Sequence, residues 1–178
     1  PEQEITTADG QYKVGDRLEP AVTEKTEQSD ARTLEWDDLI PKDYDPMVLL
    51  EGVDLDAMQD GDPRADELLA ELKAAWSDAP AVEALNGQKV RLPGFAVPLE
   101  GDEKNVNELL LVPYFGACIH VPPPPSNQIV HVFPNSPVEQ EMLYDAIWIE
   151  GTIKVESSHT KSGNAGYTFT ANSIEPYE

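Results

Sequence analysis

The residues best suited to chemistry gather in one segment, PYFGACIHVPPPPSNQ at positions 113–128. It contains the only cysteine of the chain, Cys118, and one of three histidines, His120. Two positions apart, these side chains would point to the same face of a strand. A thiolate beside an imidazole is a ligand pair that zinc and copper prefer. Antiparallel pairing would bring a histidine of the next predicted strand alongside, so the candidate zinc ligands are Cys118, His120 and His131.

The cysteine has two other interpretations. A free cysteine often packs as a small hydrophobic side chain, and a Cys-x-His pair alone is a weak metal motif. As the nucleophile of an enzyme, Cys118 would need a base within hydrogen-bond reach and an oxyanion site. The sequence holds no GxSxG, P-loop, GxGxxG or HExxH motif. We therefore expect a protein that is not an enzyme, and we assign no catalytic residue.

Four consecutive prolines follow, Pro122, Pro123, Pro124 and Pro125. Proline lacks a backbone N–H and does not fit inside a helix, so the run predicts a stiff polyproline II segment. In one interpretation the segment is a rigid rib that a partner protein grips, with Tyr114 and Phe115 lining an exposed groove beside it. In the other it only connects two strands.

The elements that must position this segment are mostly strands. Five stretches alternate in hydrophobicity or form short apolar runs, at residues 89–99, 109–112, 128–133, 146–155 and 165–171. Gly151 lies inside the fourth stretch and suits a bulge or bend. A short helix is expected at residues 137–144, between the third and fourth strands. These features predict a mainly β protein with a minor helical part, built as a small, partly open, five-stranded barrel of the OB type.

A helix and an arm precede the predicted barrel. Asp62 followed by proline is a helix-start signal, because aspartate caps the first turn and proline suits the first helical position. An amphipathic helix is expected over about residues 63–77, packed on something larger through an apolar face. That face is made of Leu68, Leu72, Ala75 and Trp76. Residues 1–33 are polar and predict an extended arm or linker, which leaves residues 34–178 as a single domain.

The charge of the chain excludes one class of function. Thirty-four acidic residues oppose twelve basic ones, for a net charge of −22. Nucleic-acid binding depends on Lys and Arg that neutralise phosphates, so a nucleic-acid partner is excluded. The same charge opposes self-association and predicts a monomer. The longest apolar run, residues 109–121, is shorter than the roughly 20 residues of a membrane-spanning helix. We expect any signal peptide or lipid anchor to lie upstream of the polar start, PEQEITTADG.

Several stretches resemble one bacterial family, domain of unknown function 3299. They are WDDLIP, APAVEALNGQKVRLPGFAVPLE, LLLVPYFGACIHVPPPPSNQIV, IWIEGTIKV and AGYTFTANSIEPY, and the resemblance runs from about Thr33 to the end. It implies exported periplasmic proteins or lipoproteins, some encoded beside ABC transporters of the MacB type and beside zinc-responsive genes. The expected function is a non-catalytic periplasmic accessory protein that works with an inner-membrane ABC transporter in zinc homeostasis. The alternative is a metal-free OB-type module that binds a protein or an oligosaccharide.

Overall fold

The computed structural model describes residues 13–18, 31–45, 48, 51–52, 61–117 and 124–177. Most of the regular secondary structure in the described chain is β-strand, with one α-helix, α1 (Pro63–Ser77). The strands are β1 (Arg32–Thr33), β2 (Lys89–Gly101), β3 (Asn105–Val112), β4 (Val130–Pro134), β5 (Val138–Glu139), β6 (Ile147–Lys154), β7 (Ser158–Thr160), β8 (Gly163–Ala165) and β9 (Tyr167–Pro176). Short 3-10 helices are η1 (Trp36–Leu39), η4 (Glu83–Leu85), η5 (Ser126–Gln128) and η6 (Gln140–Tyr144).

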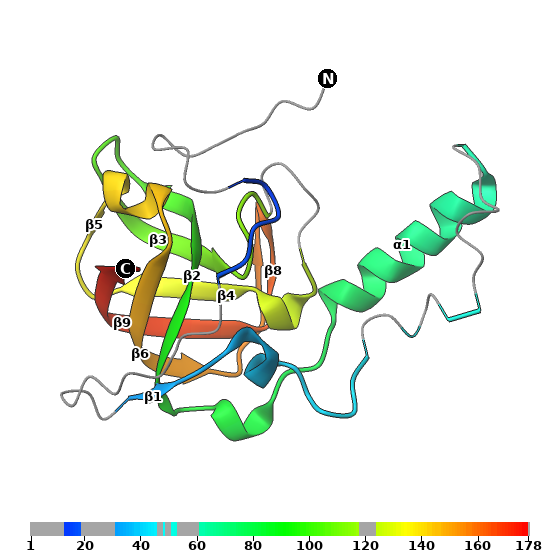
Figure 1. Cartoon of the computed structure of the whole chain (residues 1–178), viewed down its shortest axis with the longest axis horizontal. Coiled ribbons are helices and arrows are strands. Elements are labelled where there is room, and N and C mark those ends of the chain that lie inside the picture. The colour runs from blue at the N-terminus through cyan, green and yellow to red at the C-terminus, as the bar shows by residue number, and fades with distance from the viewer. Residues whose placement is uncertain are drawn as a thin grey trace.

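Five strands close into a barrel. The sheet runs β1-β2-β6-β9-β4-β3-β5, and an additional pairing of β2 with β3 joins the two sides. Within the ring, every neighbouring pair is antiparallel except β4 and β9, which are parallel. The predicted five-stranded barrel is confirmed, and Figure 1 shows its strands wrapped around a common centre. The expected helix between the third and fourth barrel strands is the short η6.

Two glycines let the strands bend and approach closely. The first half of β2 pairs with β6 and the second half with β3, and the change falls at Gly94. A Cβ there would lie 2.8 Å from the Leu111 side chain. At Gly151 a Cβ would lie 1.9 Å from the carbonyl oxygen of Thr170, and the β6–β9 register shifts at this point. The bulge predicted at Gly151 is therefore confirmed.

Apolar side chains form two separate clusters. The first, here called the barrel core, draws residues from all five barrel strands and so fills the interior. The second, here called the outer cluster, takes its barrel-strand residues from β2 and β3, on the opposite face of each strand, and adds Ala165 of β8. Along β3, for instance, Leu109 and Leu111 belong to the barrel core, whereas Leu110 and Val112 belong to the outer cluster. Alternation along a strand explains this division, because successive side chains point to opposite faces.

Helix α1 forms where it was predicted. The side chain of Asp62 accepts a hydrogen bond from the Arg64 backbone N–H, which confirms the predicted cap. Of the described helix residues, Leu72 is the buried one, and Figure 1 shows α1 reaching away from the barrel. The second half of the helix borders a cavity of about 480 Å³ that Pro124 and Asn164 also line. The four residues of the predicted apolar face are the buried Leu72 and the half-buried Leu68, Ala75 and Trp76.

Parts of the predicted arm contact the barrel. Arg32 and Thr33 form β1, which pairs in parallel with β2. Residues 13–18 lie against residues 114–116, with an antiparallel bridge between Arg17 and Tyr114. The boundary expected at residue 33 stays a prediction. In the described part of the chain, no helix is long and apolar enough to cross a membrane.

Candidate functional site

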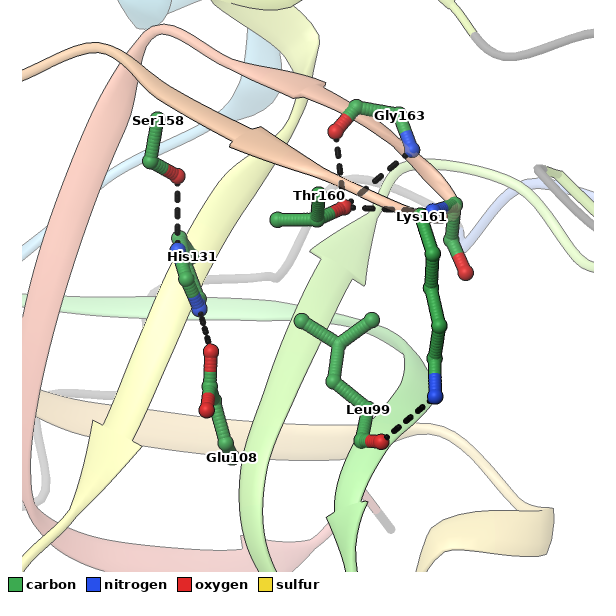
Figure 2. Close-up of polar contacts among 8 residues, drawn as sticks. Leu99, Glu108, His131, Ser158, Thr160, Lys161 and Gly163 are labelled. Carbon is green, nitrogen blue, oxygen red and sulfur yellow. Dashed lines mark hydrogen bonds and ion pairs between the residues drawn. The ribbon is translucent and has the colours of Figure 1, made fainter.

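Three polar side chains form a hydrogen-bonded chain on the outside of the barrel. Figure 2 shows Glu108 of β3, His131 of β4 and Ser158 of β7 in line. The Ser158 hydroxyl lies 2.6 Å from Nδ1 of His131, and Nε2 of His131 contacts Oε1 of Glu108. A carboxylate can only accept, so Nε2 carries the proton that it donates to Glu108. In the neutral imidazole, Nδ1 then accepts the hydroxyl hydrogen of Ser158.

The backbone explains why His131 points outward. Its neighbours Val130 and Val132 belong to the barrel core, so alternation turns the imidazole to the outer face. Opposite it on β3 stands Leu110, a member of the outer cluster. The β7–β8 hairpin covers the imidazole, which leaves His131 only 6% exposed. A buried polar side chain of this kind requires partners, and Glu108 and Ser158 supply them.

An exposed aromatic ring lies beside the chain. The centroids of the His131 and Phe133 rings are 4.4 Å apart. Phe133 is 42% exposed, unlike the other phenylalanines in the described part of the chain. It pairs with Thr170 of β9, which is also exposed. The outer surface of β3, β4 and β9 therefore presents a fixed aromatic platform with a carboxylate and a hydroxyl beside it.

The β7–β8 hairpin is held by further hydrogen bonds of its own. The Thr160 hydroxyl donates to the Gly163 carbonyl at 2.7 Å, and the backbone N–H groups of Ser162 and Gly163 donate to the same hydroxyl oxygen. Lys161 Nζ donates to the Leu99 carbonyl at 3.0 Å, which ties the tip of the hairpin to β2 (Figure 2).

A serine, a histidine and a carboxylate are also the residue types of a hydrolytic triad. Catalysis would need the Ser158 oxygen and the imidazole to reach a substrate carbonyl together. In this structure His131 is only 6% exposed, so little of the imidazole is open to a substrate. The side chain of His131 links β3 and β4 to the β7–β8 hairpin, and this arrangement is here called the clamp.

The predicted partner-binding residues fall in three places. Tyr114 and Phe115 are half-buried, and residues 13–18 lie against them. Pro124 is buried and borders the cavity beside α1, while Pro125 precedes η5 and is half-buried. Pro122 and Pro123 lie outside the described residues. A groove lined jointly by the two aromatics and all four prolines stays a prediction.

Of the three predicted zinc ligands, the structure describes only His131. Cys118 and His120 lie outside the described residues, whereas His131 is bonded to Glu108 and Ser158. Across the residues that the structure covers, no three His, Cys, Asp or Glu side chains come together in a way that could hold a metal ion. Zinc sites are usually tetrahedral. The His131–Glu108 pair offers one nitrogen and one oxygen ligand, so a complete site would depend on the cysteine and histidine just upstream.

Sequence reasoning missed Glu108 and Ser158. Glu108 stands directly before the apolar run Leu109–Val112. A charged residue is unexpected next to a strand that is buried on both faces. That mismatch was the available signal. Ser158 gave none, since serine is ordinary in a polar stretch and its partner is 27 residues away.

Comparison with known proteins gives a consistent result. The family model described as "Protein of unknown function (DUF3299)" matches residues 36–176. The crystal structure of a DUF3299 family protein from Pseudomonas aeruginosa is similar, with 42% sequence identity and a TM-score of 0.65. The match covers 84% of this chain and 98% of that one. The comparison with curated proteins found no match. The chain belongs to the DUF3299 family, and the resemblance seen in the sequence is confirmed.

Proposed function

We propose that this protein is a non-catalytic binding module of the OB class that serves as a periplasmic accessory protein of an ABC transporter. The supporting observation is the clamp formed by Glu108, His131 and Ser158. It fixes a hairpin against the outer surface of β3 and β4, the second and third barrel strands. In OB folds this surface, with the loop between the last two strands, is where ligands bind.

The exposed side chains favour a protein or a carbohydrate as the ligand. Phe133 offers an apolar ring that is held by His131 on one side and open to solvent on the other. Aromatic rings of this kind are enriched where proteins recognise partners. A chain with a net charge of −22 repels polyanions, so the ligand is neutral or basic. The periplasmic location and the transporter follow from the family resemblance and belong to the proposal.

Site-specific crosslinking tests this function. A photoreactive benzoylphenylalanine at position 133 is expected to crosslink to the purified periplasmic domain of a MacB-type transporter encoded beside a family member. The matched control is the same residue at Tyr144, which is 52% exposed but lies on η6. A crosslink at position 133 and none at 144 supports the proposal. Equal labelling at both positions, or none at either, contradicts it.

A role in zinc handling is the second candidate, and the contact between Glu108 and His131 favours it. The pair places an oxygen and a nitrogen ligand together, and Cys118 and His120 would complete a tetrahedral set. Calorimetric titration of zinc into chelator-stripped protein tests this. Sub-micromolar binding at one site, lost in Cys118→Ser, His120→Ala and His131→Ala, is the expected result. Millimolar binding at many sites, unchanged in the three variants, would show that only the acidic surface attracts the cation.

A further inference from the structure

One face of α1 lines the cavity between the helix and the barrel. The described lining residues are Leu69, Leu72, Lys73, Trp76 and Ser77 of the helix, together with Pro124 and Asn164. The five helix positions follow the i, i+3, i+4, i+7, i+8 spacing of a single helix face. At 3.6 residues per turn, the acidic residues Glu67 and Glu71 fall on the opposite side. The helix therefore turns its carboxylates away from the cavity and its apolar side chains towards it.

The size of the cavity suits an extended apolar chain. Its volume is about 480 Å³, whereas an apolar cavity of about 150 Å³ already holds benzene. The lining from Leu69 to Ser77 extends over about 12 Å of helix, at a rise of 1.5 Å per residue. Leu69 is also 48% exposed, so this wall of the cavity is in contact with solvent. A ligand that covered Leu69 and Trp76 would remove apolar surface from water.

The polar groups of the cavity are hydrogen-bond donors. Lys73 is the one charged residue among the described lining residues, and within the described chain it forms no ion pair. Oδ1 of Asn164 is bonded to Nδ1 of His159 at 2.9 Å, which leaves the amide N–H groups of Asn164 to donate. The Ser77 hydroxyl is already bonded to the Lys73 carbonyl. An ammonium and an amide beside apolar walls favour a ligand with an apolar body and an anionic acceptor.

We propose that this cavity binds a fatty acid, with the carboxylate at Lys73 and the alkyl chain along Leu69, Leu72 and Trp76. The net charge of −22 repels polyanions, but a fatty acid carries a single charge, and the charged group that lines the cavity is positive. This is a second ligand, apart from the one proposed to bind at Phe133. The cavity uses no residue of the clamp, so its test and the crosslinking test can fail independently.

Calorimetric titration of the full chain with octanoate, decanoate and dodecanoate tests the proposal, at concentrations below micelle formation. Wild type is expected to bind each at a single site. Each added CH₂ should tighten binding by up to about fourfold until the cavity is filled. Lys73→Gln should weaken decanoate binding about fivefold, as expected for the loss of an exposed ion pair. The same variant should bind the neutral analogue decanol as wild type does, because only the charge has been removed.

A matched pair of variants locates the ligand. Leu69→Glu replaces an apolar wall of the cavity by a carboxylate, and should weaken decanoate binding at least about tenfold. Ala70→Glu adds the same charge at the next position, which is exposed and outside the described lining, and should leave binding unchanged. Both positions are exposed, so both variants should fold, which circular dichroism and thermal unfolding verify.

Three results would overturn the proposal. Wild type might bind none of the fatty acids, Leu69→Glu and Ala70→Glu might bind decanoate equally, or Lys73→Gln might weaken decanol as much as decanoate. Flotation with phosphatidylglycerol vesicles separates a free fatty acid from a lipid bilayer. Co-flotation of wild type that is lost in Leu69→Glu, without binding of free fatty acids, would also overturn the proposal and identify a membrane surface as the partner.

Discussion

The outer surface of β3 and β4 has two halves that differ in polarity and in burial. At the C-terminal half of β3, Leu110 and Val112 are apolar on the outside as well, and covering segments bury them completely. At the other half, Glu108 and His131 face outward and Phe133 stays in contact with solvent. An uncovered apolar strand face is an aggregation hazard, which explains the covers over the first half. In the second half the hairpin covers His131, and only the Phe133 ring stays exposed.

The covers come from distant parts of the sequence. Leu18, Ala117 and Ala165 all pack on the outer cluster, yet they belong to the arm, to the stretch after β3 and to the hairpin. The polar half is held by a single imidazole between Glu108 and Ser158. One half is therefore stabilised mainly by burial, and the other by a directional hydrogen-bond chain. Substitutions in the two halves should differ accordingly.

The largest expected effect comes from Leu110→Ala in the covered half. Leu110 is fully buried, so the substitution removes a packed side chain and leaves a cavity, at a cost of about 2–5 kcal/mol in unfolding free energy. Phe133→Ala in the open half should cost less than about 1 kcal/mol, because the ring is already 42% exposed. Denaturant unfolding monitored by tryptophan fluorescence measures both. Similar losses in the two variants would remove the distinction between the halves.

A smaller effect is expected when the clamp is broken. His131→Ala leaves the half-buried Ser158 hydroxyl and Glu108 carboxylate without their partner, which costs about 1–3 kcal/mol at most. Combined with Glu108→Gln in a double-mutant cycle, it should show a coupling of about 0.5–3 kcal/mol. Glu103→Gln, an exposed acid in the β2–β3 turn, serves as the uncoupled control. Additive losses from positions 108 and 131 would show that the contact contributes nothing to stability.

The third comparison, of Gly116→Ala with Gly87→Ala, separates the cost of backbone strain from the cost of a steric clash. Gly116 and Gly87 have nearly equal φ angles, +84° and +81°, but only Gly116 has Val14 against it. Each substitution to alanine should cost about 1 kcal/mol for the left-handed backbone. Only Gly116→Ala should also speed hydrogen exchange at the Gly15 amide, since it pushes the arm segment away. Unchanged exchange there would mean that the valine moves aside freely.

The smallest effect is a pH dependence at the turn before β3. The Asp102 carboxylate accepts backbone N–H bonds from Lys104 and Asn105, and these bonds lower its pKa. A lowered pKa in the folded state means that the stabilisation is present above the unfolded value, about 3.9, and is lost as pH falls through the folded one. An NMR titration of the Asp102 carboxyl carbon should give a midpoint below that value. A midpoint at or above it would contradict the turn geometry.

The sequence predicted what depends on local patterns. Asp62 before proline located α1, and the alternation along residues 146–155 located β6, because caps and periodicity act over a few residues. The clamp was out of reach, since Glu108 and Ser158 meet His131 from 23 and 27 residues away. The docking of residues 13–18 was also missed, because their polar character indicates solvent and two backbone hydrogen bonds leave no compositional trace.

The parallel pairing of β4 with β9 has a consequence for how the molecule forms. Val130 is paired with Tyr167, and the last strand also lies along the whole of β6. The ring cannot close before residue 167 has left the ribosome, so the first four barrel strands spend synthesis without their final neighbour. Barrels dominated by such distant pairings fold in milliseconds to seconds, far more slowly than helical bundles. Until β9 has been synthesised, the apolar strands are without their final partner. The negative charge of the chain then opposes aggregation with other chains.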